Sequence, residues 1–152
     1  MSFDIVQLAT ARYIFASTMQ NTSGLHEILY VSTLASDAPI RVVADIAAKS
    51  RSANLSRDIT GLLVFDGMHF CQQFEGSDIE VSALMGRIRQ DPRHTNIEML
   101  HHGPLAERRF RRWSLGYTSV DDVEAFERLK RLRGQTAVDA FMGMLSSLDV
   151  DS

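Results

Sequence analysis

A β-hairpin predicted near the middle of the chain constrains the possible fold more than any other feature. Two mostly apolar runs flank Asp66-Gly67, a dipeptide that is typical of a tight hairpin turn. In the second run Gln72 alternates with Phe70 and Phe74, so a carboxamide shares one face of the sheet with two large apolar rings. A half-buried carboxamide needs both a donor and an acceptor as partners. We therefore expect other polar side chains on the same face.

Strand and helix patterns alternate along the rest of the chain. Asp37 is a good helix cap before Pro39, and Ser77 starts a capping-box sequence before an apolar stripe that should end at Asp91-Pro92. The patterns predict strands at about 25–32, 59–66, 68–75, 95–102 and 113–118, with one crossover helix from about 37 or 38 and another between Ser77 and Asp91. This βαββαββ order predicts an α+β, ferredoxin-like fold, with both crossover helices on one face of a mostly antiparallel sheet.

Helical patterns also occupy both ends of the chain. Residues 1–24 are predicted to form a helical extension that ends in a polar break, and residues 119–152 are predicted to form two helices separated at Gly134. The apolar sides of the C-terminal helices need a partner surface, either the sheet face opposite the crossover helices or a subunit interface. The residues expected on that sheet face are Leu29, Val31, Cys71 and Met99. Residues 25–118 form the predicted central domain.

Composition excludes several classes of protein. The net charge is −3, with 16 basic against 19 acidic residues, so the whole chain shows no electrostatic footprint for nucleic acid, and we interpret the basic run at 108–112 as a solvated edge. A single cysteine, Cys71, rules out an internal disulfide and suits a reducing compartment. No apolar stretch reaches about 18 residues, and the N-terminus lacks the pattern of a signal peptide. We expect a cytoplasmic protein without a membrane role, and the spacing of its histidines predicts no metal site.

Polar residues can converge between the predicted sheet and the first crossover helix. Tyr30 and Gln72 can point to the same face by strand alternation, while Ile46, Ser50 and Asn54 follow one side of the helix at i+4 spacing. A phenol and two carboxamides make a poor core unless a polar planar ligand satisfies them. The alternative is that each group binds backbone atoms separately, and the spacing leaves both possibilities open.

Several segments, in order along the chain, resemble one known family. They are Leu29-Tyr30-Val31-Ser32, Ser50–Asn54 with Ile59-Thr60-Gly61, Phe70–Gly76, Asp91-Pro92-Arg93-His94 and Arg109–Leu115. Together they resemble the BLUF domain, a blue-light sensor that uses FAD, over residues 25–118. The resemblance implies a flavin held between the two crossover helices with its ring facing the sheet. FMN and riboflavin stay open as alternatives to FAD.

The resemblance also implies a role for each matching residue. Tyr30 corresponds to the photoactive tyrosine, which gives an electron and a proton to the excited flavin. Gln72 corresponds to the glutamine that then changes its hydrogen bonds, which slightly red-shifts the flavin absorption. Asn54 corresponds to the residue that binds the pyrimidine edge of the ring. The other residues expected around the cofactor are Ser50, Ile46, Asp91, Arg93 and His94.

Two positions depart from the family pattern. Ala53 stands where many members have a second asparagine, and Leu115 stands where a methionine usually follows the Trp-Ser pair. Trp113 and Leu115 are the expected relay from the glutamine toward the last strand, although Leu115 lacks the thioether that could contact the amide. Cys71 is expected to form no flavin adduct, because alternation turns it away from the face of Gln72.

We expect the chain to act as a sensor and not as an enzyme. The residues after position 118 are too few for a catalytic effector domain. The expected output is therefore a change in binding to an unidentified partner protein, or in contacts within a homo-oligomer. Two alternatives come from other classes of protein: a small hydrolase of the acylphosphatase type, and an interaction domain that does not respond to light.

Overall fold

The computed structural model describes residues 24–119 and 123–146. In chain order its elements are β1 (Leu25–Leu34), α1 (Val42–Ser56), β2 (Thr60–Phe65), β3 (His69–Ser77), α2 (Asp78–Gln90), β4 (His94–Pro104), β5 (Gly116–Ser119), α3 (Val123–Leu129) and α4 (Gln135–Ser146). The predicted N-terminal helix lies outside the described residues. Within the described ranges, no helix combines the length and the apolar character needed to cross a membrane.

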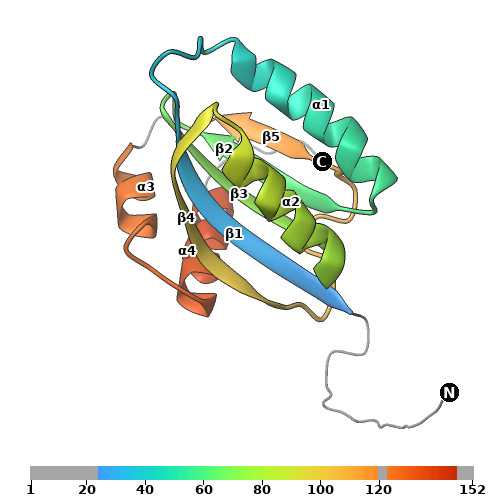
Figure 1. Ribbon diagram of the computed structural model, residues 1–152. Helices are drawn as coiled ribbons and strands as arrows, with labels where there is room; N and C mark the ends of the chain where they lie inside the picture. The colour runs from blue at the N-terminus through green and yellow to red at the C-terminus, as the bar shows by residue number, and fades with distance from the viewer. Residues whose placement is uncertain (1–23, 120–122, 147–152) are drawn as a thin grey trace, which may run out of the picture.

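A five-stranded sheet forms the centre of the protein, in the order β4-β1-β3-β2-β5. β1 pairs antiparallel with β3 and β4, β3 pairs antiparallel with β2, and β5 runs parallel to β2. Figure 1 shows α1 and α2 over one face of this sheet and α3 and α4 over the other. The arrangement confirms the predicted α+β fold with two crossover helices on one face.

Alternation along the strands divides the core into two layers. On the face that α1 and α2 cover, Tyr30 packs with Val81 of α2, and Phe70 packs with Ile46 of α1. These contacts hold both helices against the sheet. The functional residues expected on this face therefore lie where these two helices meet the sheet.

The second layer lies under the C-terminal helices. Leu29, Val31 and Cys71 are buried there with Phe126 of α3 and Phe141 of α4. The C-terminal helices thus pack on the sheet face opposite the crossover helices, which is the first of the two placements expected from the sequence.

The expectation that Met99 shares this second layer is wrong. Met99 pairs with Tyr30 in the β1–β4 ladder, so its side chain lies on the opposite face, where it is 37% exposed. A register shift between Leu29 and Tyr30 changes the alternation along β4, and Leu100 takes the buried position.

The predicted start of α1 at residue 37 or 38 is also wrong, because the helix begins at Val42. The Val42 N–H donates to Pro39 O at 3.0 Å, a bond to the third residue before it that belongs to a tight turn. Arg41 precedes the helix, and its side chain makes no capping hydrogen bond. Asp37 and Pro39 therefore lie in the turns that lead into the helix.

The start of α2 confirms the capping-box prediction. Ser77 has extended backbone geometry, and its hydroxyl accepts a hydrogen bond from the Glu80 N–H at 3.2 Å. The helix ends at Gln90, before the residue that precedes Pro92. The position of this helix end determines where the turn after α2 meets the sheet.

β5 begins later than predicted, at Gly116. Side chains of α1 bind the carbonyl groups before it: Asn54 Nδ2 donates to Ser114 O at 2.9 Å, and Arg51 Nε donates to Leu115 O at 3.1 Å. Because these acceptors are already satisfied, the segment does not need a neighbouring strand to bind them. α1 therefore helps to fix the path of the chain into β5.

Two glycines provide a matched test of this packing. A Cβ at Gly61 would lie 2.2 Å from Gln73 O in β3, whereas a Cβ at Gly86, which is exposed on α2, would meet nothing within 4 Å. We expect Gly61→Ala to destabilise the protein by about 3 kcal/mol through overpacking. We expect Gly86→Ala to stabilise it by up to about 1 kcal/mol through helix propensity. Urea unfolding measures both free energies, and equal stability of the two variants would contradict the close approach at Gly61.

Candidate functional site

A cavity of about 50 Å³ lies where the sheet meets α1, α2 and the turn after α2. The structure brings together at this cavity all of the residues expected as switch or cofactor residues: Tyr30, Gln72, Ile46, Ser50, Asn54, Asp91, Arg93 and His94. Leu115 lines it as well, and Leu63, Leu84 and Ile88 complete its apolar wall. Sequence reasoning assigned no site role to these three, although Leu84 and Ile88 belong to the apolar stripe of α2. Trp113 does not line this cavity.

A hydrogen bond between β1 and β3 lies in the cavity wall. Tyr30 and Gln72 are direct partners in the β1–β3 ladder, and the Tyr30 hydroxyl donates to Gln72 Oε1 at 2.6 Å. Both side chains are buried, and burial raises the pKa of the Tyr30 phenol far above its usual value. The phenol is therefore a neutral donor. Because it occupies the carbonyl end of Gln72, the NH₂ end is the one that can donate to a ligand.

α1 contributes three side chains that lie one helical turn apart. Ile46, Ser50 and Asn54 follow each other at i+4 spacing along the side of the helix that faces the cavity. Asn54 is buried, and its NH₂ group donates to Ser114 O. A carboxamide has a second N–H and a carbonyl oxygen, so Asn54 has further capacity for a ligand. It thus lines the cavity and holds the segment before β5 at the same time.

An ion pair shapes the edge of the cavity. Asp91 accepts hydrogen bonds from Arg93 Nε and Nη2 at 2.9 and 2.7 Å, and from the Arg93 backbone N–H at 3.0 Å. These bonds hold the pKa of the Asp91 carboxyl below its usual value, and the same pairing raises the pKa of Arg93. A bidentate pair of this kind fixes the orientation of the guanidinium, so a positive charge is held at the cavity.

His94 is a buried imidazole beside the tyrosine. Its Nδ1 lies 2.8 Å from Ser32 Oγ, and its ring centroid lies 4.8 Å from that of Phe70 and 6.2 Å from that of Tyr30. Burial lowers the pKa of His94, an effect larger than the opposing effect of the Asp91 charge, so the ring is neutral near pH 7. Among the described residues, no three His, Cys, Asp or Glu side chains are grouped so that they could hold a metal ion.

These side chains suit the flavin that the sequence resemblance implies. The pyrimidine edge of a flavin combines carbonyl acceptors with an N–H donor, and the cavity presents the carboxamides of Gln72 and Asn54, the hydroxyl of Ser50 and the cation of Arg93. The leucine and isoleucine side chains suit a flat ring. At about 50 Å³ the cavity is smaller than the roughly 300–1,000 Å³ typical of ligand pockets. Binding of a ligand as large as a flavin must therefore widen this cavity.

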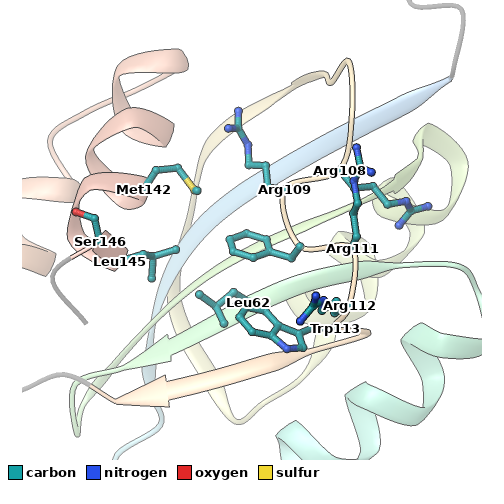
Figure 2. A pocket seen from close by; sticks show the side chains of 10 residues that line it. Leu62, Arg108, Arg109, Arg111, Arg112, Trp113, Met142, Leu145 and Ser146 are labelled. Atoms are coloured by element: carbon teal, nitrogen blue, oxygen red, sulfur yellow. The ribbon is translucent and has the colours of Figure 1, made fainter. Parts of the chain in front are cut away.

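Trp113 lies with the other layer of the core, under the C-terminal helices. Its ring stacks on Phe110, with ring centroids 5.8 Å apart and ring planes inclined by 18°. Both rings line a second cavity of about 500 Å³, whose opposite wall belongs to α4 (Figure 2). The structure therefore separates the two expected relay residues: Leu115 lines the first cavity with Gln72, and Trp113 lines the second.

The basic run at 108–112 is not simply the solvated edge that its composition indicated. The side chains of Arg108 and Arg109 are only 18% and 23% exposed, and they pair with Asp58 and Glu27. Glu27 is buried in β1. Its place on the apolar face of an alternating strand is the sequence signal that could have identified a buried acid in need of a basic partner.

Comparison with known proteins adds an independent finding. The family described as "BLUF: Sensors of blue-light using FAD" matches residues 25–116. The blue light- and temperature-regulated antirepressor BluF of Escherichia coli (strain K12) is 35% identical over 86 residues, which are 57% of this chain and 21% of that protein. The photoactivated adenylate cyclase subunit beta of Euglena gracilis is 36% identical over 97 residues, which are 61% of this chain and 11% of that protein. The chain thus spans less than a quarter of the length of these two relatives.

Solved structures show the same similarity. The dark-state structure of BlrB, described as a BLUF protein, matches with a TM-score of 0.62 and 33% identity, over 71% of this chain and 83% of that chain. The ground state of BlsA matches with a TM-score of 0.71 and 25% identity, over 84% of this chain and 91% of that chain. The second match extends over more of this chain than the family match does.

The buried His94 should make stability depend on pH. Its pKa is lower in the folded protein than in the unfolded chain, so its contribution to stability is complete above about pH 6.5 and is lost as the pH falls through the folded-state pKa. We expect the free energy of unfolding of the wild type to fall more between about pH 7 and pH 5 than that of His94→Asn. Urea unfolding at both pH values measures this difference, and equal slopes for the two proteins would show that His94 is not the group responsible.

Proposed function

The chain belongs to the BLUF family, the sensors of blue light using FAD, and on this basis we propose that it is a photoreceptor whose switch is the Tyr30–Gln72 pair. The observation that carries this proposal is the 2.6 Å hydrogen bond from the Tyr30 hydroxyl to Gln72 Oε1 in the cavity wall. The bond joins a group that can release a proton to a group that can both accept and donate. Such a pair can change its hydrogen bonds without a large movement of the backbone.

The proposed chemistry of the chain lies in these two side chains. When bound, a flavin supplies the absorption of blue light and, in its excited state, an acceptor for an electron and a proton. Burial holds the pKa of the Tyr30 phenol high, so its proton leaves together with an electron and not by simple ionisation. Gln72 Oε1 is the acceptor in contact with that proton. Exchange of the two ends of the Gln72 carboxamide, which are similar in size but opposite in hydrogen bonding, is the proposed signalling change.

We assign binding of the cofactor to α1 and to the turn after α2. Asn54 and Ser50 offer hydrogen bonds, Arg93 offers a fixed positive charge, and Ile46 belongs to the apolar wall. His94 is neutral near pH 7, so it can bind a polar edge without adding charge beside the switch. FAD is the proposed cofactor, and FMN and riboflavin carry the same ring and would meet the same residues.

The proposed output is a change in protein contacts, with no reaction catalysed by the domain itself. Leu115 lines the cavity with Gln72 and directly precedes β5, whereas Trp113 packs with the layer under α4. The short segment between them therefore connects the switch to the C-terminal helices. The relatives are named as an antirepressor and as a subunit of an adenylate cyclase, so the family occurs in proteins with different outputs. A partner protein or a second copy of this chain is the proposed receiver, in the cytoplasm.

The first test removes one hydroxyl. We expect Tyr30→Phe to bind flavin as the wild type does, because the ring is kept, and to lose the reversible red shift after blue light, because the bond to Gln72 is gone. Absorption spectra before and after illumination measure the shift. Gln90→Ala, at the exposed end of α2, is the control and should shift like the wild type. A normal shift in Tyr30→Phe would mean that another residue drives the switch.

The second test concerns the charge at the cavity. We expect Arg93→Ala to weaken flavin binding about tenfold, the effect of losing roughly 1.4 kcal/mol of a charged hydrogen bond. Titration of the flavin-free protein with FAD, FMN and riboflavin, followed by flavin fluorescence, measures the dissociation constants and ranks the three cofactors. Arg89→Ala removes an exposed arginine of α2 and should leave them unchanged. Equal affinities of the two variants would remove Arg93 from the proposed site.

A further inference from the structure

A buried acidic network lies on the reverse face of β3, behind the switch residue. Gln73 follows Gln72 in the chain and is 0% exposed, and its side chain lies between Glu27 of β1 and Glu75 of β3. The two glutamates are 1% and 0% exposed. Buried carboxylates are unfavourable unless charges and hydrogen bonds compensate them. The hydrogen-bond partners of Glu27 and Glu75 therefore show which part of the chain the two carboxylates hold in place.

Glu75 binds four donors with its two oxygens. Oε1 accepts from Gln73 Nε2 and from the backbone N–H of Arg109, both at 3.0 Å. Oε2 accepts from the Thr60 hydroxyl at 2.7 Å and from the backbone N–H of Phe110 at 2.9 Å. Two of these donors are consecutive amides in the loop between β4 and β5. Glu75 thus ties this loop to the centre of the sheet.

Arginine side chains of the loop also attach it to the sheet. Arg109 Nε and Nη2 donate to the two oxygens of Glu27 at 2.9 and 3.2 Å, a bidentate geometry that fixes the guanidinium. Arg108 donates to Thr60 Oγ1 at 2.8 Å and to Asp58 O at 2.9 Å. The loop is therefore bound to the sheet by side chains and by its own backbone amides.

The hydrogen bonds of Gln73 are incompletely satisfied in this network. Within the described residues, its Oε1 is a buried acceptor without a hydrogen-bond partner, which is unfavourable. Its Nε2 lies 3.1 Å from Glu27 Oε1 and 3.0 Å from Glu75 Oε1, so the two acids share one NH₂ group. A movement of the β3 backbone at Gln72 also moves Gln73, and this changes how the NH₂ group is divided between the acids.

We propose that Glu75 is a positioning residue that couples the switch to the loop that carries Trp113. The inference rests on the proposed function, because it needs a light-driven change at Gln72. In the dark, Glu75 holds Arg109 and Phe110 against the sheet, and Phe110 stacks on Trp113. After light, a small shift of β3 at Gln72 weakens this hold, and the loop moves together with the cavity wall that it forms (Figure 2).

Hydrogen exchange in the flavin-loaded wild type tests the coupling without any substitution. We expect the amides of Arg109 and Phe110 to exchange at least about tenfold faster under blue light than in the dark, because their common acceptor is weakened. The Glu80 amide also donates to a side-chain oxygen, Ser77 Oγ, and serves as the control. Its exchange rate should be the same in light and dark.

Glu75→Gln tests the carboxylate itself. The substitution keeps the shape of the side chain but replaces one oxygen with an NH₂ group, which cannot accept from a loop amide. We expect the variant to keep the red shift of the flavin and to lose the light-induced change in acrylamide quenching of Trp113, the single tryptophan of the chain. Glu98→Gln removes an exposed carboxylate that pairs with Arg133 and should behave like the wild type.

The outcomes separate this inference from the proposed function. A flavin-loaded wild type without a red shift would overturn both. A red shift with equal exchange of the Arg109 and Phe110 amides in light and dark would overturn the inference alone. A Glu75→Gln variant whose Trp113 still responds to light would do the same. If this variant does not fold, the exchange measurement in the wild type decides.

Discussion

The register between β1 and β3 is the constraint on which the rest of the structure depends. Because Tyr30 lies opposite Gln72, one antiparallel ladder sends the phenol and the carboxamide to one face, and sends Gln73 with its acidic neighbours to the other. A slip of one residue would turn Gln72 toward the C-terminal helices and bring Gln73 into the cavity. The same backbone hydrogen bonds thus define both polar clusters, and any change in β3 acts on both.

Side chains of α1 and β3 help to hold the segment that leads into β5, beside the backbone hydrogen bond from the Gly61 N–H to Trp113 O. Asn54 and Arg51 bind its carbonyl groups from α1, and Glu75 binds the amides of Arg109 and Phe110 from β3. A backbone ladder forms and breaks cooperatively, whereas hydrogen bonds to separate side chains can be lost one at a time. This arrangement suits the proposed signalling role, in which the segment changes its position while the five-stranded sheet stays intact.

Sequence reasoning succeeded where local spacing controls the outcome. Strand alternation placed Tyr30 and Gln72 on one face, and i+4 spacing brought Asn54 to the same cavity. It failed where contacts distant in the chain intervene. A register shift in the β1–β4 pair places Met99 on the face opposite to the one expected. The buried Glu27 of β1 pairs with Arg109, so this arginine is not part of the solvated edge that the basic run indicated. Alternation could have marked Glu27 as a buried acid but could not name Arg109 as its partner, and the register shift leaves no periodic signal, because each depends on a contact that is remote in the sequence.

The two roles of Asn54 link occupancy of the cavity to the stability of the fold. Its carboxamide donates to Ser114 O and also lines the cavity, so a ligand that orders Asn54 favours the docked form of the segment before β5. A ligand that binds only the folded state stabilises it by about 2.7 kcal/mol at a free concentration 100 times its dissociation constant. Under the proposed cofactor binding, the flavin would therefore stabilise the fold as well as absorb light, and the flavin-free chain would unfold more often.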